Sequence, residues 1–331
     1  MDVTPQMPMQ AGQDPGCTSI PTDRAALKAR SMGERTAEAL QSARQGWVLG
    51  MFRQNCDLVS DRGDVVVLAW GEAQNGPLNV LLDAPPPKLT SCGTRWTFDG
   101  CCLTVGADPK AEKRGGMPSV PASGRWTVDL GDARSWDARP DWDQLGARRA
   151  AVLAAVPSLG STVGQWPVTR LVSAERLPWI WGDWLRAARH VVTAQRDADP
   201  LALSLAAQDL CGLGPGLTPA GDDWLAGWLL GLWLVDWPAQ PTEKAMLVLQ
   251  RAATQTNRLS QAFLACAAAG EADENWHGLL DAMARWPDEN AALVRFASAI
   301  LARGATSGFA MLTGFLAALG WVEPADGVHR E

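Results

Sequence analysis

Short apolar runs separated by turn residues dominate the chain between about residues 45 and 130. Stretches rich in Gly, Pro or charged residues, such as 61–64, 75–77 and 85–87, lie between these runs. Such alternation is typical of strands joined by turns. The predicted strands are 47–52, 65–70, 78–82, 95–98, 102–105 and 125–130. Because no helical pattern interrupts them, they predict an antiparallel sheet or a small barrel.

The pattern changes period from Asp141 onward, where Ala- and Leu-rich segments end at Pro or Gly. The helices predicted there are 141–155, 177–195, 200–210, 219–236, 242–269, 274–284, 288–302 and 307–319. Strand signals are nearly absent after 169–172, so this half is predicted to be all-α. One further helix is expected over 24–44, ahead of the strands. The fold class predicted for the whole chain is therefore α+β.

The change of period also predicts the domain boundaries. A β-rich domain with its leading helix is expected over 23–140, and an all-α domain over 141–322. Residues 1–22 are rich in Pro, Gln and Met, with neither a basic start nor an apolar core. They are therefore expected to be a disordered tail rather than a secretory signal, and 323–331 is expected to be a second tail.

Composition and charge narrow the classes of function. Apolar residues make up 47% of the chain, and the net charge is −7 without a Lys- or Arg-rich run, which argues against a nucleic-acid or membrane-surface partner. The longest apolar stretch, 224–235, is too short to span a bilayer. The seven cysteines show no repeated CxxC spacing and the three histidines are not near a cysteine pair, so no metal is expected. Reduced thiols and a cytoplasmic location are expected.

Candidate chemistry concentrates in the turn Gly212-Leu-Gly-Pro-Gly-Leu-Thr-Pro-Ala-Gly-Asp-Asp223. Gly212, Gly214, Gly216 and Gly221 allow backbone conformations closed to other residues and let a ligand approach the main chain. Thr218 is predicted to be the N-cap of the following helix, with Pro219 at its first position. Unpaired N–H groups at a helix N-terminus favour an anion. The turn therefore predicts a site for a small anionic metabolite.

Asp222 and Asp223 fall in the first turn of that helix. Two carboxylates there can simply complement the helix dipole. Alternatively, one of them faces the ligand and accepts a hydrogen bond from an amide N–H, or a divalent cation bridges the two. An anion that also carries amide N–H groups, such as a carbamoyl or ureido acid, suits the second interpretation. No other cofactor is expected.

A second copy of this pattern follows 87 residues later. The spacing Gly221-x-x-x-Leu225-x-Gly227 matches Gly308-x-x-x-Leu312-x-Gly314, and both copies follow a threonine, Thr218 or Thr306. A structural repeat would bring two helix N-termini to one pocket, with the hydroxyl of Ser307 added to the site. The polar cluster 254–260 is either a solvent-facing interruption of a helix or a further wall of this pocket, through Thr256, Asn257 or Ser260.

These motifs resemble a bacterial family of long-unassigned function that includes the H subunit of oxamate carbamoyltransferase, from allantoin and purine degradation. The turn 212–227 resembles its first signature, Gly304-Ala-Thr-Ser-Gly308 its second, and Asn75-Gly-Pro77 a turn in its β-rich half. The resemblance covers roughly 24–320. The second motif departs from the family pattern, because Ala305 stands where a His is common and Ala310 where an acidic residue is common.

The resemblance implies a transferase subunit that moves a carbamoyl group between carbamoyl phosphate and oxamate, giving oxalurate. It implies that Gly214 and Gly216 hold phosphate or carboxylate and that Asp222 or Asp223 accepts from an amide nitrogen. Thr218 or Ser307 would orient that nitrogen, and other subunits would complete the enzyme. Two alternatives stay open: a non-catalytic metabolite-binding or scaffold subunit, and a stand-alone enzyme acting on another small carboxylate or amide.

Overall fold

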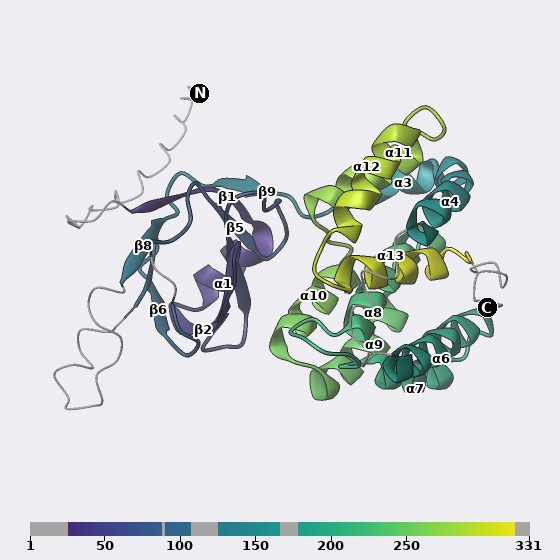
Figure 1. Cartoon of the computed structure of the whole chain (residues 1–331), viewed down its shortest axis with the longest axis horizontal. Helices are drawn as coiled ribbons and strands as arrows, with labels where there is room; N and C mark the ends of the chain where they lie inside the picture. The colour runs from purple at the N-terminus through teal and green to yellow at the C-terminus, as the bar shows by residue number, and fades with distance from the viewer. Residues whose placement is uncertain (1–25, 88–89, 107–124, 166–177, 322–331) are drawn as a thin grey trace, which may run out of the picture.

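The computed structural model describes residues 26–87, 90–106, 125–165 and 178–321. These residues form a β-barrel followed by a helical domain, and the two lie side by side (Figure 1). The α+β class predicted from the sequence is thereby confirmed. Both predicted tails and the isolated strand signal at 169–172 lie outside the described residues.

The described part of the first domain contains nine strands. They are β1 (Leu27–Gly33), β2 (Gln45–Met51), β3 (Asn55–Ser60), β4 (Val65–Ala69), β5 (Asn79–Leu82), β6 (Arg95–Phe98), β7 (Cys102–Val105), β8 (Trp126–Asp129) and β9 (Arg134–Trp136). Neighbours follow in the order β5-β4-β3-β2-β6-β7-β8-β1, and β1 also pairs with β5, so the sheet closes into an eight-stranded barrel. Strand β9 is added beside β1.

Two predictions for this domain need correction. The sheet is mixed rather than antiparallel, because β1 runs parallel to β8 and β9, and β4 runs parallel to β5. The single helix expected over 24–44 is wrong for its first half, where β1 forms, and α1 occupies only Glu34–Ser42. Strand β1 is stabilised by pairing with three strands that are distant in sequence, which its Ala- and Leu-containing composition does not reveal. Strands β3 and β9 were not predicted.

The barrel interior is filled by alternate residues of its strands. In β7 and β8 every second residue is buried, as expected for strands with one face on a core. Trp96 and Leu103 are among the fully buried side chains of this core. Strand β4 is buried on both faces: Val66 and Leu68 face the barrel core, whereas Val65, Val67 and Ala69 belong to a second cluster with Leu259 and Cys266 of the helical domain.

Most helices of the second domain lie close to the predicted ranges, but the helix predicted over 141–155 is wrong, because two helices separated at Arg148 form there and the second continues to Gly164. The helices are α3 (Trp142–Ala147), α4 (Arg149–Gly164), α6 (Pro178–Arg196), α7 (Pro200–Leu210), α8 (Ala220–Val235), α9 (Thr242–Gln255), α10 (Arg258–Ala268), α11 (Glu274–Ala284), α12 (Asn290–Leu301) and α13 (Ser307–Ala318). The helix predicted over 242–269 is broken between α9 and α10. Thr256 is extended there, and the Asn257 side chain accepts from the Ser260 N–H at 3.1 Å, which caps the new helix.

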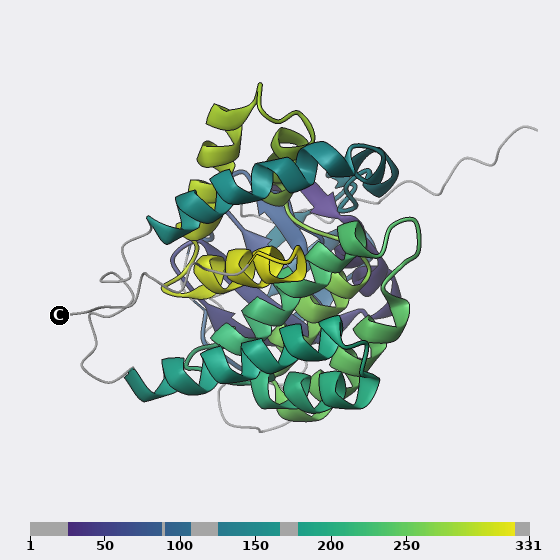
Figure 2. The ribbon, with the colours of Figure 1, turned by 90° about the vertical axis from the view of Figure 1, so that its right-hand side faces the viewer.

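Helix α8 forms the centre of the helical-domain core, and Figure 2 shows α13, in yellow, in the middle of that domain. Each residue of α8 from Ala220 to Leu234 is buried, as its continuous apolar sequence predicts. Helix α13 packs directly on it through glycines: a methyl group on Gly227 would lie 1.8 Å from the Met311 carbonyl oxygen, and one on Gly314 would lie 2.0 Å from that of Trp224. The two helices can approach this closely only because these positions lack side chains.

Candidate functional site

The Gly-rich turn folds back on the start of α8. Gly212, Gly214 and Gly216 have φ values of 76°, 120° and 102°, in the region that favours glycine. The Gly212 N–H donates to Asp222 Oδ1 at 2.9 Å, and the Gly221 N–H donates to the Leu213 carbonyl at 2.9 Å. These two N–H groups of the turn are therefore bonded within the protein.

Thr218 does not cap α8, which corrects the sequence prediction. The helix begins at Ala220 after Pro219, which occupies the N-cap position in an extended conformation and offers no side-chain acceptor. The Thr218 hydroxyl instead lies 3.1 Å from the Ser307 hydroxyl at the first residue of α13. The N-termini of α8 and α13 thus meet at one place, as the hypothesis of a repeat requires. The positive ends of two helix dipoles converge there.

Asp222 is held by its own domain. It is 3% exposed and accepts from the Gly212 N–H and from the Thr256 hydroxyl. Burial raises its pKa, while the donors from Thr256, Gly212 and Ser260 act in the opposite direction. The polar cluster at 254–260 is divided: Thr254, Asn257 and Arg258 are exposed to solvent. Thr256 contacts this carboxylate, and Ser260 is 1% exposed. Asn257 joins the same region, since its side chain donates to the Leu217 carbonyl at 2.9 Å.

Asp223 has a different environment. Its carboxyl is 8% exposed, and its Oδ2 has no hydrogen-bond partner among the described residues. Burial raises the pKa of Asp223 to about 7, and the charge of Asp222 adds to the increase. The hydroxyls of Ser307 and Thr218 lower it. A buried carboxyl with an unsatisfied oxygen and a pKa near neutrality is suited to exchanging a proton with a ligand.

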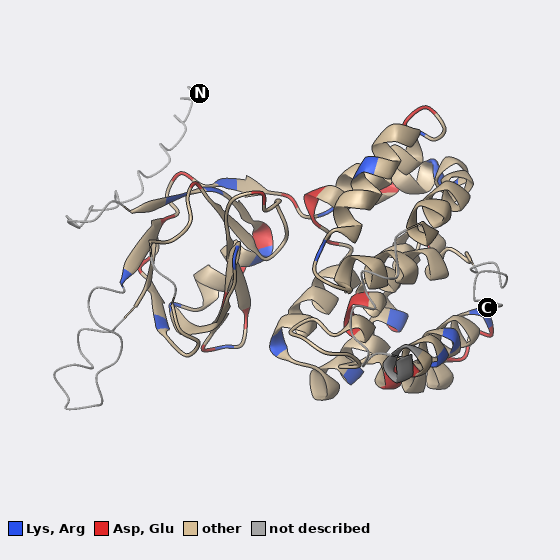
Figure 3. Cartoon of the chain, viewed as in Figure 1, with Lys and Arg blue, Asp and Glu red and all other residues tan. Residues whose placement is uncertain are grey.

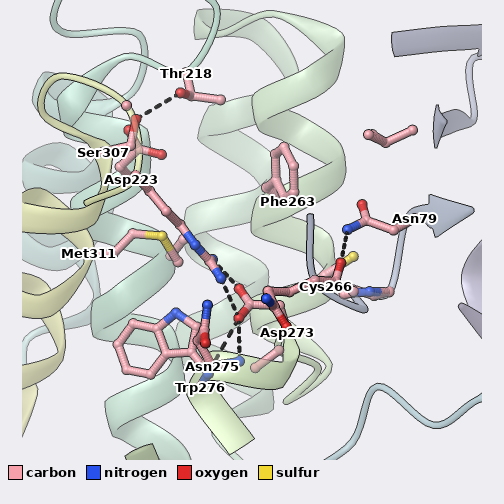
Figure 4. Close-up of a pocket in the computed structure, with 18 of the residues that line it drawn as sticks. Asn79, Thr218, Asp223, Phe263, Cys266, Asp273, Asn275, Trp276, Ser307 and Met311 are labelled. Atoms are coloured by element: carbon pink, nitrogen blue, oxygen red, sulfur yellow. Dashed lines mark hydrogen bonds and ion pairs between the residues drawn. The ribbon is translucent and has the colours of Figure 1, made fainter. Parts of the chain in front are cut away.

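This carboxyl lines a cavity of about 840 Å³ between the barrel and the helical domain. The barrel supplies Asn55 of β3, Val67 and Ala69 of β4, and Asn79 of β5, together with the loop around Gly76. The helical domain supplies the first turns of α8, α11 and α13, the inner face of α10 and the end of α12. In Figure 4, Thr218, Asp223 and Ser307 lie together at one end, and Asp273, Asn275 and Trp276 at the other.

Acidic groups outnumber basic ones around the cavity. The lining carboxyls are Glu72, Asp222, Asp223, Glu271 and Asp273, and Arg303 is the single cationic side chain among the described lining residues. Two of these carboxyls are paired: Arg35 Nε lies 2.5 Å from Glu271, and Arg303 bonds Asp273 through both terminal nitrogens. Asp222 and Asp223 both belong to the first turn of α8, and Figure 3 shows the acidic positions of the described residues in red.

The structure sorts the predicted site residues into two groups. Thr218, Asp222, Asp223, Ser260 and Ser307 line the cavity. The other predicted residues contribute no lining surface to it: Gly212, Gly214, Gly216, Gly221, Thr256, Thr306 and Gly308. Several of these support the lining residues, since Gly212 and Thr256 bond Asp222, and a methyl group on Gly308 would lie 1.8 Å from the Ile300 carbonyl oxygen.

Sequence reasoning missed the opposite end of the cavity. Arg303 and Asp273 lie 30 residues apart and showed no common motif, and Asn79 belongs to the other domain. One signal was present: Arg303 directly precedes the second glycine motif at Gly304, so it lies beside the predicted site in sequence.

One group in the described residues has the spacing of metal ligands outside this cavity. Cys101, Cys102 and Asp129 place one ligand atom each within 4.8 Å of one another, at the joined ends of β7 and β8. The two thiols are side by side, contrary to the opposite faces expected of adjacent strand residues, because Cys101 lies in a bend before β7. Both of their N–H groups donate to Asp99 Oδ1.

None of the helices in the described ranges combines the length and the apolar character needed to cross a bilayer.

Comparison with known proteins identifies one family. Residues 210–319 match the family described as oxamate carbamoyltransferase subunit AllH, which confirms the resemblance seen in the sequence over these residues. The matched segment runs from the Gly-rich turn through α13 and therefore contains Asp222, Asp223 and Ser307. No curated protein and no solved structure matches the chain.

Proposed function

We propose, from the match of residues 210–319 to the oxamate carbamoyltransferase subunit family, that this chain binds oxamate and oxalurate in the cavity between its two domains. In the reaction that the resemblance to this family implies, the amide nitrogen of oxamate attacks the carbamoyl carbon of carbamoyl phosphate. A C–N bond forms, the C–O bond to phosphate breaks, and phosphate leaves with the electron pair. The nitrogen must lose one proton, so a nearby base assists the transfer.

The environment of Asp223 carries this proposal. Its unpartnered Oδ2 can accept a hydrogen bond from the oxamate amide, which has two N–H donors. With its pKa near 7, Asp223 can take the proton from the attacking nitrogen and return it to the departing phosphate. The hydroxyls of Thr218 and Ser307, 3.1 Å apart at the same end of the cavity, can orient the amide.

Asp222 has a positioning role in this proposal. Its oxygens accept from Gly212 and Thr256, so it ties the Gly-rich turn and the start of α10 to α8 and leaves Asp223 to face the cavity. The glycines of the turn then act by shaping the start of α8, and the ligand is bound by the side chains beside them.

The charges that line the cavity also support a role for partner subunits in the reaction. Carbamoyl phosphate carries a dianionic phosphate, and five carboxyls with one guanidinium are a poor environment for it. We propose that another subunit binds the phosphate and that the complete site forms at a subunit contact. The excess of carboxyls also favours one alternative, a subunit that binds the metabolite and performs no chemistry. Turnover and binding must therefore be measured separately.

The test is isothermal titration of oxamate and oxalurate into the chain, alone and with its partner subunits, together with turnover of the complex. Asp223→Asn should weaken oxamate binding about tenfold, equivalent to about 1.4 kcal/mol for a hydrogen bond to a charged group. The rate of the wild-type complex should rise with pH through about 7, following the pKa of Asp223, and this dependence should vanish in the variant.

Asp57→Asn is the matched control. Asp57 is another buried aspartate, 3% exposed, whose pKa burial raises to about 6, but it lies in β3 and does not line the cavity. Its side chain accepts from the cavity-lining Asn55, so its substitution should change binding much less than Asp223→Asn does and should leave the pH profile as in wild type. Equal effects of the two substitutions would refute the role of Asp223. Normal binding without turnover in any subunit combination would favour the non-catalytic alternative.

A further inference from the structure

The guanidinium of Arg303 bonds Asp273, which lies at the end of the cavity away from Asp223 (Figure 4). This arginine follows the end of α12, and its guanidinium bonds both carboxylate oxygens of Asp273, with 2.6 Å between its second terminal nitrogen and Oδ1. Its side chain remains 31% exposed and contributes to the cavity lining. The ion pair is therefore open on its cavity side.

The hydrogen bonds at this end leave Arg303 with unused donors. A guanidinium has five N–H groups in a rigid plane, and the two bonds to Asp273 use two of them. Asp273 is itself held in place, because it caps α11 and accepts from the N–H groups of Asn275 at 3.0 Å and Trp276 at 3.3 Å. Asp273 thus fixes the plane of the guanidinium without using all of its donors.

The charges around the cavity limit which anion can bind there. With Glu271 paired to Arg35 and Asp273 paired to Arg303, the carboxyls of Asp222 and Asp223 remain, together with that of the exposed Glu72. The N-termini of α8, α11 and α13 supply partial positive charge. Asp273 already neutralises the charge of Arg303, so the free N–H groups of Arg303 and these helix ends favour a single negative charge, and a dianion would meet stronger repulsion from the remaining carboxyls.

We infer that Arg303 binds the carboxylate of a small monoanionic amide whose nitrogen lies toward Asp223. This inference rests on the proposed function, which places the amide end at Asp223, and it assigns the residue that selects a carboxylate at the other end. The site then discriminates in two ways: Arg303 selects a carboxylate over a neutral group, and the surrounding carboxyls disfavour a phosphate dianion.

Oxamate and its neutral analogue oxamide test this assignment, since oxamide replaces only the carboxylate by an amide. The measurement is the ratio of their dissociation constants, by titration calorimetry with the chain in complex with its partner subunits. The wild type should bind oxamate at least about tenfold more tightly than oxamide, the ratio that one added charge-assisted hydrogen bond provides. Titrated into the chain without its partner subunits, inorganic phosphate should bind more weakly than oxamate.

Two variants separate recognition of the ligand from stability of the ion pair. Asp273→Asn removes the carboxylate that competes for Arg303 and keeps a side chain able to cap α11, so the preference for oxamate should increase. Asp273→Asn combined with Arg303→Gln leaves two neutral side chains that can bond each other, and the preference should fall to about one. Arg35→Lys alters the other ion pair at the cavity, between Arg35 and Glu271. Because Arg35 does not line the cavity, this variant should keep the wild-type ratio of dissociation constants.

The outcomes distinguish this inference from the proposed function. If the double variant keeps the wild-type ratio, the inference is overturned, while weaker oxamate binding in Asp223→Asn still supports the proposed function. If Asp223→Asn binds oxamate normally but the ratio depends on Arg303, the carboxylate assignment to Arg303 stands, and the role of Asp223 in the proposed function and the placement of the amide nitrogen beside it are overturned. If the wild-type complex binds neither oxamate nor oxamide, both are overturned.

Discussion

Asp222 and Asp223 are adjacent in the sequence and differ in what surrounds them. Asp222 accepts from a backbone N–H and a hydroxyl of its own domain, whereas Asp223 leaves one oxygen unpartnered beside the cavity. Successive residues of a helix point about 100° apart. Both aspartates line the cavity, but the oxygens of Asp222 are bonded to the Gly-rich turn and to Thr256. At the residue scale, the contacts of each side chain decide its role.

The raised pKa of Asp223 predicts how stability depends on pH. Because the folded-state pKa, about 7, exceeds the ordinary value of 3.8, the folded protein holds this proton more tightly than the unfolded chain does. The resulting stability is present below about pH 4 and is lost as pH rises through 7. Asp223→Asn, which cannot ionise, should escape this loss. From pH 5 to pH 8 the variant should therefore gain stability relative to wild type, by at least about 1.4 kcal/mol.

Urea denaturation of both proteins at these two pH values measures the difference. Asp222 titrates in both proteins, so its contribution largely cancels in the comparison. A difference between variant and wild type that is the same at pH 5 and pH 8 would contradict the raised pKa.

At the element scale, the contact between α8 and α13 depends on glycines. Gly227 and Gly314 let each backbone approach the other, and the N-termini of the two helices meet at the Thr218–Ser307 contact as a result. The sequence repeat of Gly and Leu predicted that the two segments are related. It did not reveal that the segments pack on each other, because the spacing of residues within a helix carries no information on its neighbour.

Gly227→Ala should therefore destabilise the protein and disturb the site. The added methyl group would overlap the Met311 carbonyl oxygen, so α13 must shift, at a cost of about 1–3 kcal/mol for overpacking a core. Gly182→Ala in α6 is the control, since its methyl group would meet nothing within 4 Å. It should stabilise the protein by about 0.5–1 kcal/mol through helix propensity. Thermal unfolding of both variants measures this, and equal effects would contradict the close contact.

The helices that were predicted incorrectly from the sequence differ from the structure for physical reasons. The segment 27–33 has the composition of a helix but forms β1, because β5, β8 and β9 provide hydrogen-bonding partners for its backbone. The break after Gln255 was visible as a cluster of Thr, Asn and Ser, side chains that compete with helical hydrogen bonds. Recognising that this cluster caps α10 and forms part of the site required knowledge of the residues that contact it in the folded protein.

At the scale of the whole molecule, the barrel and the helical domain form the site together. The outer face of β4 packs against α10, and polar contacts on either side connect the domains: Arg35 with Glu271, and Asn75 with Glu274. Asn75 is part of the β-domain turn that resembles the family pattern, and it also accepts from Ser31. The cavity exists because these contacts hold the domains in one arrangement.

Arg35→Ala should weaken this arrangement. It leaves the largely buried Glu271 carboxylate without its partner, which costs about 1–3 kcal/mol for an unsatisfied charged group. Oxamate binding should weaken as well, because the barrel wall of the cavity is less firmly held. Arg285→Ala is the control: its pair with Asp281 is exposed and 4.0 Å long, so the loss should be below about 0.5 kcal/mol. Chemical denaturation and titration would show both effects, and similar values for the two variants would contradict the interdomain role.

The sequence by itself determined the elements whose pattern is local. Strand alternation predicted the β-rich domain, continuous apolar residues predicted the buried α8, and the Gly-Asp turn predicted the start of α8 as the candidate site. These follow from properties of residues close together in the chain, namely periodicity, backbone freedom and charge at a helix start. The family resemblance likewise rests on two short motifs.

Only the tertiary structure decided which groups meet. Closure of the barrel by β1, the pairing of Thr218 with Ser307, and the approach of Arg303 to Asp273 each join residues 30 or more positions apart. The pKa of Asp223 depends on burial by those same contacts. Such interactions depend on how complete elements pack, and a linear pattern of residues does not encode which face of one element meets which face of another.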